Sequence, residues 1–146
     1  MSQVLKKENI YFKNKVETWQ EAVQIAVLPL IDQGYCEDRY IDGILENTKK
    51  YGPYYVLCED MALIHANSEQ GVRATQIAIT ILSEPIKFKE GGYDVRALIA
   101  LAAKDSSSHM SALRAISKIF ADESKKNILL KSHSREDIYN LFELNL

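Results

Sequence analysis

The sequence predicts an α/β fold: a single domain in which a mixed β-sheet is flanked by α-helices on both faces. Segments with helical spacing of apolar residues stand near both ends of the chain, and short apolar runs stand between them. The last two of these runs are almost entirely apolar, as expected of strands that are covered on both faces. With 146 residues, 47% of them hydrophobic, the chain has the size of one domain, and we expect this domain to span residues 1–146.

Two helices are expected in the first third of the chain. Thr18 and Glu21 have the spacing of a capping box, and apolar residues then recur every three or four positions, which predicts a helix to about Gly34. The apolar spacing from Ile41 to Thr48 predicts a second helix, which Gly52-Pro53 should end. We assign no element to residues 1–16, where Lys, Glu and Asn are mixed with scattered apolar residues.

The middle of the chain should supply the sheet. Four apolar runs bounded by turn residues predict strands: Tyr54 to Cys58, Met61 to Ala66, Gln76 to Leu82 and Val95 to Ala103. The first two flank Glu59-Asp60, and the last two are the runs that should be buried on both faces.

Helical spacing returns after Asp105. One predicted helix carries four residues on a shared face, namely His109, Leu113, Ile116 and Phe120. Ser134 with Asp137 should open a final helix that bears Ile138, Leu141 and Phe142. The expected order of helices, strands and helices favours a sheet that is covered by helices.

Composition excludes several classes of function. The formal charge is −2 without a long run of one sign, so no nucleic-acid or basic membrane-binding surface is indicated. The longest apolar run, Ala97 to Ala103, is far shorter than the roughly 20 residues that span a bilayer, and no targeting segment is recognised. We therefore expect a cytoplasmic protein that is not inserted in a membrane. Cys36 and Cys58 lack a metal-ligand spacing and are expected to be free thiols.

Two histidines are the candidates for chemistry. The sequence lacks the common phosphate-loop, dinucleotide, serine-hydrolase and zinc-protease motifs, and no cofactor or metal is expected. His65 ends an apolar strand, and His109 begins a helix after a polar loop. Imidazole is largely neutral at pH 7 and can both accept and release a phosphoryl group. A second imidazole and a helix N-terminus would supply donors to such a group.

Ordinary structural roles stand beside this hypothesis. From spacing alone, His65 is more often a hydrogen-bonded histidine of a half-buried strand, and His109 a surface residue of a first helical turn. His133, in a polar loop, is expected to be a surface residue. A metal site formed by Cys58, Glu59 and the two candidate histidines would be the remaining option, but their spacing does not indicate one.

Several segments of the chain carry a resemblance to a known family. They are Tyr40–Asn47, Tyr51–Val56 and Met61–Ala66, with further matches at Trp19–Ala22, Pro29-Leu30, Gly34-Tyr35, Gly71-Val72 and Asp105–His109. In these segments the chain resembles the mannitol/fructose-type enzyme IIA family of bacterial sugar phosphotransferase systems, and within it most closely the ascorbate-specific branch. The resemblance therefore covers nearly the whole chain.

The resemblance implies a phosphoryl relay. His65 would accept a phosphoryl group on Nε2 from the phosphohistidine carrier protein and pass it to a cysteine of enzyme IIB, with membrane enzyme IIC acting later in the uptake of a sugar such as ascorbate. His109 would lie beside the reacting ring. The chain departs from the family near this site: Ile64 replaces a proline, Asn67 replaces a basic residue, and Asn47 stands where the mannitol branch has an arginine. Glu59 matches a glutamate of that branch.

Two other functions remain open at this stage. A regulatory interaction protein that keeps the enzyme IIA fold would fit the departures at Ile64 and Asn67. A small hydrolase would fit the two histidines, but the sequence shows no nucleophile or oxyanion loop for it.

Overall fold

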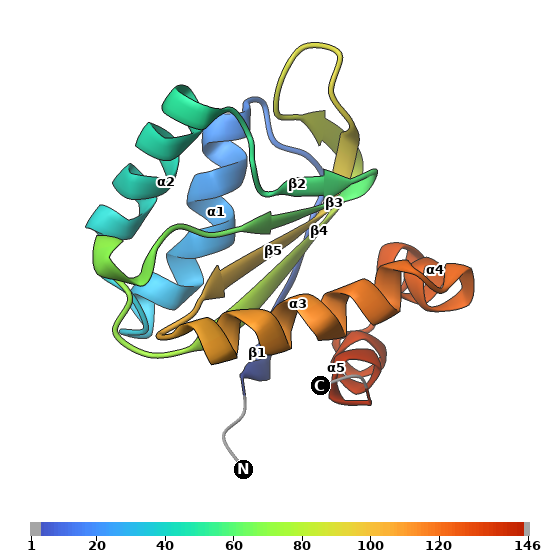
Figure 1. The fold of residues 1–146 in the computed structure, drawn as a ribbon. Helices are drawn as coiled ribbons and strands as arrows, with labels where there is room; N and C mark the ends of the chain where they lie inside the picture. The colour runs from blue at the N-terminus through green and yellow to red at the C-terminus, as the bar shows by residue number, and fades with distance from the viewer. Residues whose placement is uncertain (1–3, 145–146) are drawn as a thin grey trace.

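The structure, a computed structural model, describes residues 4–144 of the chain as a mixed β-sheet between two layers of helices (Figure 1). Residues 1–3 and 145–146, which the expected domain includes, lie outside the described residues. The element order is β1 (Leu5–Lys13), α1 (Trp19–Asp32), α2 (Arg39–Tyr51), β2 (Val56–Cys58), β3 (Asp60–Ile64), a 3₁₀ helix η1 (Ser68–Gln70), β4 (Gln76–Lys87), β5 (Asp94–Ala102), α3 (Ser106–Phe120), α4 (Glu123–Lys131) and α5 (Arg135–Glu143).

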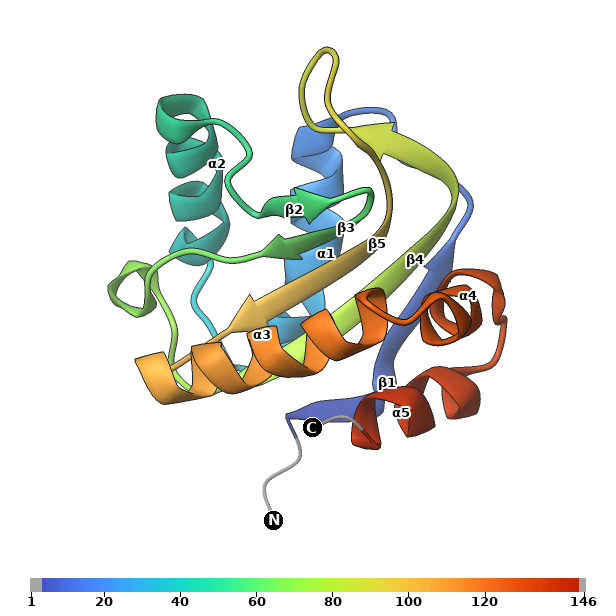
Figure 2. The same ribbon diagram turned by 45° about the vertical axis from the view of Figure 1, so that its right-hand side comes forward.

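The five strands of this region lie in the order β1-β4-β5-β3-β2. β1 runs parallel to β4 and β3 parallel to β5, whereas β4 with β5 and β2 with β3 form antiparallel pairs. Helices α1 and α2 cover one face, and α3, α4 and α5 cover the other (Figures 1 and 2). The predicted α/β class with helices on both faces is confirmed.

Alternation along the central strands divides the core in two. On β5, Leu98 and Ala100 belong to the apolar cluster beneath α1 and α2, whereas Ala97 and Ile99 belong to the cluster beneath α3 and α5. Successive side chains of a strand point to opposite faces, so a strand covered on both sides is apolar at nearly every position. This confirms the expectation that the runs after Gln76 and Val95 are buried on both faces.

Strand β1 corrects the expected order, because the sheet begins before the first helix. Only Leu5, Asn9 and Ile10 of this strand are fully buried, and its pairing with β4 shifts register between Leu5 and Ile10. β1 is an edge strand with polar residues and an irregular register, so its apolar residues do not alternate with a period of two. The sequence pattern therefore did not predict it. Lysine and glutamate on an edge are also typical of strands that must not pair with other chains.

The ends of two strands and one additional helix also differ from the expectation. β4 continues past Leu82 to Lys87 through exposed residues 83–85, with a register shift against β5 that accommodates Pro85. β3 ends at Ile64, so His65 and Ala66 lie just beyond the strand. Helix α4 was not expected, because Leu129 and Leu130 are its only buried residues and too few to produce a helical pattern.

The helix starts follow the predicted capping residues. Thr18 accepts a hydrogen bond from the backbone N–H of Glu21, and Ser134 accepts one from that of Asp137. Gly52, with φ +79°, ends α2 as expected. All three residues expected to face the core from the last helix, Ile138, Leu141 and Phe142, are buried.

The predicted face of α3 is shifted by about one position. Ala112, Ala115, Ile116 and Ile119 are buried, whereas His109, Leu113 and Phe120 are only partly buried. Two of the buried residues are alanines, whose small side chains let the helix approach the sheet closely. The predicted face was based on the large apolar residues and therefore omitted these alanines. His109 consequently lies beside the buried stripe.

Cys36 and Cys58 are free thiols, as predicted. Burial raises the pKa of the Cys36 thiol to about 12, so it remains protonated and unreactive. Across residues 4–144, none of the helices combines the length and the apolar character needed to cross a membrane.

Candidate active site

His65 owes its direction to the alternation of β3. Met61 and Leu63 face the helix layer of α3, whereas Ala62 and Ile64 face that of α1 and α2. Continuing the alternation by one residue sends the His65 side chain toward α3. Because β3 ends at Ile64, the ring is only partly buried and lies at the carboxyl end of the strand.

His109 reaches the same place from the first turn of α3. Asp105 caps this helix by accepting a hydrogen bond of 2.8 Å from the backbone N–H of Ser108, and the backbone N–H of His109 donates to the Asp105 carbonyl. The ring centroids of His65 and His109 are 4.9 Å apart, with the planes tilted by 55°. The expected proximity of the two rings is therefore found.

A hydrogen bond fixes the tautomer of His65. Its Nδ1 lies 2.6 Å from the carbonyl oxygen of Leu63. A carbonyl oxygen only accepts, so Nδ1 must carry the hydrogen and donate it. In the neutral ring the lone pair is then on Nε2, which is the nitrogen left for a reacting group.

The surroundings favour the neutral form of His65. Burial lowers its pKa below the ordinary value of 6.5, the hydrogen bond to Leu63 opposes this change, and the adjacent His109 ring lowers the pKa further. A neutral imidazole with a free lone pair is the nucleophilic form, so the site holds His65 ready to accept an electrophile at neutral pH.

This lowered pKa gives a prediction for the titration of the protein. An NMR titration should place the midpoint of His65 below 6.5. The unfolded chain then binds more protons than the native one, so His65 should contribute stability that is present above the unfolded pKa and lost as pH falls through the native one. Chemical unfolding at pH 7.5 and 5.5 should show a larger loss for the wild type than for His65→Gln. A His65 midpoint above 6.5 would contradict the prediction.

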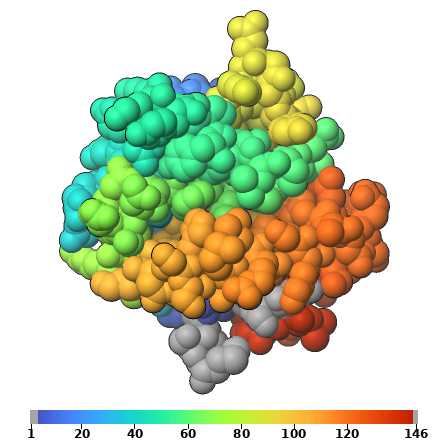
Figure 3. Space-filling model, in the orientation of Figure 1, coloured from blue at the N-terminus to red at the C-terminus, as the bar shows by residue number. Residues whose placement is uncertain are grey.

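The two histidines lie in a surface depression of about 570 Å³. Its wall is formed by the segment after β3 and by the loop and first turn of α3, and these two segments lie next to each other at the surface (Figure 3). The first backbone N–H groups of a helix have no partner within that helix and attract anions. Ser106 of α3 lines the depression, so the site combines a nucleophilic ring with donors suited to an anionic group.

Two tyrosine hydroxyls hold the backbone just after β3. The Tyr54 hydroxyl donates to the carbonyl oxygen of His65 at 2.5 Å. The Tyr40 hydroxyl accepts from the backbone N–H of Ala66 at 2.9 Å and donates to the carbonyl oxygen of Leu101 at 2.8 Å. The carbonyl and the N–H of the peptide between His65 and Ala66 are therefore both fixed by side chains.

A pair of amide side chains joins η1 to α2. Asn47 donates to Gln70 at 2.9 Å, and Gln70 in turn accepts from the backbone N–H of Asn67 at 3.1 Å. Asn47 also lies 3.5 Å from the Tyr54 hydroxyl. Asn47 and Asn67 are thus parts of one hydrogen-bonded network. They are two of the positions at which the sequence departs from the family that it resembles.

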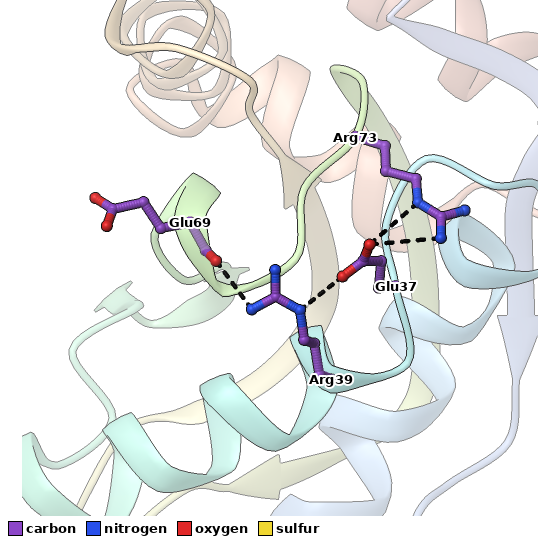
Figure 4. A network of polar contacts seen from close by, with 4 residues as sticks. All are labelled: Glu37, Arg39, Glu69 and Arg73. Carbon is purple, nitrogen blue, oxygen red and sulfur yellow. Dashed lines mark hydrogen bonds and ion pairs between the residues drawn. The ribbon is translucent and has the colours of Figure 1, made fainter.

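Ion pairs brace the other side of η1. Arg39 donates to the Glu37 carboxylate at 2.6 Å and to the backbone carbonyl of Glu69 at 3.0 Å, and Arg73 pairs with the second Glu37 oxygen (Figure 4). The Arg39 guanidinium, with help from Arg73, lowers the pKa of Glu37. These charged side chains are largely exposed, so the ion pairs contribute little to the free energy of unfolding. Their structural effect is to hold the backbone of η1 at Glu69 against the start of α2.

Glu59 lies away from the candidate site. It precedes β3, whereas His65 follows it, so the whole strand separates the two residues. Cys58 is at the same distant end, which separates it from both histidines. Among residues 4–144 no group of three or more His, Cys, Asp and Glu side chains is placed to hold a metal ion.

Sequence reasoning did not identify Tyr40, Tyr54 and Gln70 as parts of the site. Tyr54 bonds His65 across 11 residues, Tyr40 bonds Ala66 across 26, and Gln70 bonds Asn47 across 23. Such separations leave no periodic pattern. The nearest signal is the aromatic pair after Gly52-Pro53, which predicts the start of a strand and belongs to a segment that carries the family resemblance, but to which no role at the site was given.

Comparisons with known proteins show which family the chain is similar to. A family model described as "Phosphoenolpyruvate-dependent sugar phosphotransferase system, EIIA 2" matches residues 3–145. The chain is 31% identical over 138 residues to the ascorbate-specific EIIA component of Escherichia coli strain K12, with 93% of this chain and 90% of the relative covered. It is 29% identical over 141 residues to the mannitol-specific cryptic enzyme IIA component of the same strain, with 97% and 96% covered.

Solved structures show the same architecture. The solution structure of the mannitol-specific cryptic enzyme IIA from Escherichia coli matches with a TM-score of 0.86 and 28% identity, covering 97% of this chain and 96% of that one. Relatives with two different sugar names are thus similar to the chain to nearly the same degree, so the comparisons establish the family rather than the sugar.

Proposed function

The chain belongs to the EIIA 2 family of the phosphoenolpyruvate-dependent sugar phosphotransferase system, and we propose that it carries a phosphoryl group on Nε2 of His65. The observation that supports this most directly is the bond from Nδ1–H of His65 to the Leu63 carbonyl, because it leaves the lone pair on the opposite ring nitrogen. The donor would be the phosphohistidine carrier protein, and the acceptor enzyme IIB.

The transfer needs no proton to leave Nε2. The lone pair of Nε2 attacks phosphorus while the bond between phosphorus and the carrier's histidine breaks, and that electron pair returns to the carrier's ring. The Nδ1–H stays on the Leu63 carbonyl throughout, so the phosphorylated ring keeps a partner for its remaining hydrogen. In the second transfer the Nε2–phosphorus bond breaks, and a cysteine thiolate of enzyme IIB takes the phosphoryl group. Positioning supplies most of the catalysis in such transfers, and no cofactor takes part.

The negative charge of the phosphoryl group is stabilised by donors at the site. His109, whose ring centroid is 4.9 Å from that of His65, supplies a ring N–H. The N-terminus of α3, which contributes Ser106 to the depression, supplies the positive end of a helix dipole. These groups act more strongly as charge accumulates on the transferring oxygens, so they lower the barrier as well as hold the product.

Each partner must bind and leave rapidly. An open depression at the end of a strand suits a transient interface of modest area better than a large apolar one. We propose that the relay operates in the cytoplasm and serves a membrane enzyme IIC that imports a sugar such as ascorbate, the compound named in one of the relatives.

A labelling experiment tests the proposal. The purified protein is incubated with phosphoenolpyruvate, the first enzyme of the system and the phosphohistidine carrier protein. Mass spectrometry should show a gain of one phosphoryl group that is lost in acid and kept in base, as a nitrogen-linked phosphate is. Omitting the carrier should prevent the gain. Labelling without onward transfer to any enzyme IIB would instead favour the regulatory function, and the absence of any label would refute the carrier function.

A further inference from the structure

We propose that Tyr54 is a positioning residue for phosphoryl transfer: its hydroxyl holds the backbone of His65 so that Nδ1–H points to Leu63 and Nε2 is left for the phosphoryl group. This inference rests on the proposed function of His65. It assigns to Tyr54 a role in the reaction although its side chain does not contact the reacting atom.

Tyr54 contacts His65 in two ways. Its hydroxyl donates to the His65 carbonyl at 2.5 Å, and its ring meets the imidazole edge-on, with centroids 5.5 Å apart and planes at 83°. His109 contacts the same imidazole with a centroid distance of 4.9 Å. One contact fixes the backbone from which the side chain departs, and the two aromatic contacts limit the rotation of the ring.

The tyrosine is itself anchored on α2. The Asn47 side chain lies 3.5 Å from the Tyr54 hydroxyl and donates to Gln70, which accepts from the backbone N–H of Asn67. The segment from His65 to Asn67 is therefore tied to α2 at both of its ends. Gly43 permits this approach, because a Cβ there would lie 2.9 Å from Nε2 of Gln70.

The short bond from His65 to Leu63 requires such a constraint. It joins residues only two positions apart, so it forms only when the backbone after β3 and the side-chain torsions are both correct. Ile64 gives this position more backbone freedom than a proline would. The hydrogen bonds from Tyr54 and to Tyr40 replace that rigidity by fixing the peptide that follows His65.

The hydroxyl of Tyr54 is a donor over the physiological range. Burial raises its pKa, and the hydrogen bond with Asn47 only partly opposes this. The phenol therefore stays protonated, and its hydrogen goes to the His65 carbonyl. Removing the oxygen while keeping the ring should free the carbonyl without altering the aromatic packing.

The test is Tyr54→Phe, read in two ways. In the unphosphorylated protein, ¹⁵N NMR of the His65 ring should show the Nδ1–H tautomer dominant in the wild type and a mixture of tautomers in the variant. In the transfer assay, kcat from the phosphorylated carrier should fall about tenfold while KM stays within about twofold, since misplacing a nucleophile slows chemistry more than docking. Thermal unfolding checks that the variant is folded, and if it is not, Asn47→Ala removes the next link of the network and should shift the tautomer in the same direction.

Tyr55→Phe is the matched control. The Tyr55 hydroxyl also bonds a residue of α2, lying 2.9 Å from Oγ1 of Thr48, and Tyr55 is buried whereas Tyr54 is partly buried. This hydroxyl bonds Thr48 and not His65, so its loss should lower stability without changing the tautomer or kcat. The proposal is overturned if Tyr54→Phe keeps both the wild-type tautomer and kcat, or if Tyr55→Phe changes them equally. Should the wild type not be phosphorylated at all, the proposed function fails, and the NMR comparison alone still decides whether Tyr54 orients the ring.

Discussion

Replacing His65 with Ala should abolish phosphoryl labelling altogether rather than slow it. Nε2 of this residue is the proposed acceptor atom, and the neighbouring His109 is placed by α3 and not by β3, so it cannot move into the same position. Loss of the nucleophile removes the covalent intermediate and with it the route to enzyme IIB. The measurement is intact-protein mass spectrometry after incubation with phosphoenolpyruvate, the first enzyme of the system and the phosphohistidine carrier protein.

His133→Ala is the control for this experiment. His133 is an exposed residue whose ring lies 6.2 Å from that of Phe12, on the edge strand β1. That strand is separated from β3 by β4 and β5. The control variant should therefore gain one phosphoryl group at the wild-type rate. A His65→Ala protein that is still labelled at a histidine would exclude His65 as the carrier.

The sheet centre could be predicted because its physical signal is local. A strand that is covered on both faces is apolar at nearly every position, and β5 from Ala97 to Ala102 is apolar and buried at each residue. The helix starts at Thr18 and Ser134 were predictable for a similar reason, since the capping side chain and the backbone N–H that it binds are three residues apart.

The edges of the fold could not be predicted in this way. β1 is stabilised by pairing with β4 and by tertiary contacts such as the one between Asn9, which is fully buried, and Gln33. A buried asparagine among lysines and glutamates does not resemble a strand until its distant partner is known. α4 has only 9 residues, and packing against the rest of the domain stabilises it more than its intrinsic helix propensity does.

The candidate site was only partly accessible from the sequence. The position of His65 after an apolar strand and of His109 at a helix start indicated that the rings could meet, and the resemblance to enzyme IIA proteins supplied the roles. Alternation along Met61, Leu63 and His65 would also have predicted the direction of the ring. The network through Tyr54, Asn47 and Gln70 forms because α2 packs against η1. No feature of the sequence indicates that these two elements are in contact.

Replacing His109 with Ala should slow phosphorylation without preventing it. The variant keeps the nucleophile on His65 and loses one donor to the phosphoryl oxygens. A hydrogen bond to a charged group contributes about 1.5–3 kcal/mol, which corresponds to a rate loss of roughly 10- to 150-fold. Rapid-quench measurement of the label should show this decrease in rate with a normal final extent of one phosphoryl group.

Two further variants separate the loss of a donor from the loss of bulk on α3. Met110→Ala removes a partly exposed side chain from the same depression without removing a donor, so it should transfer at nearly the wild-type rate. His109→Gln keeps a side-chain N–H near the ring and should recover part of the rate that His109→Ala loses. Recovery by glutamine together with an unaffected Met110→Ala would establish His109 as a donor to the phosphoryl group. If His109→Ala is not labelled while His65→Ala is labelled normally, the two histidines have the opposite roles, and the free Nε2 of His65 is not the acceptor.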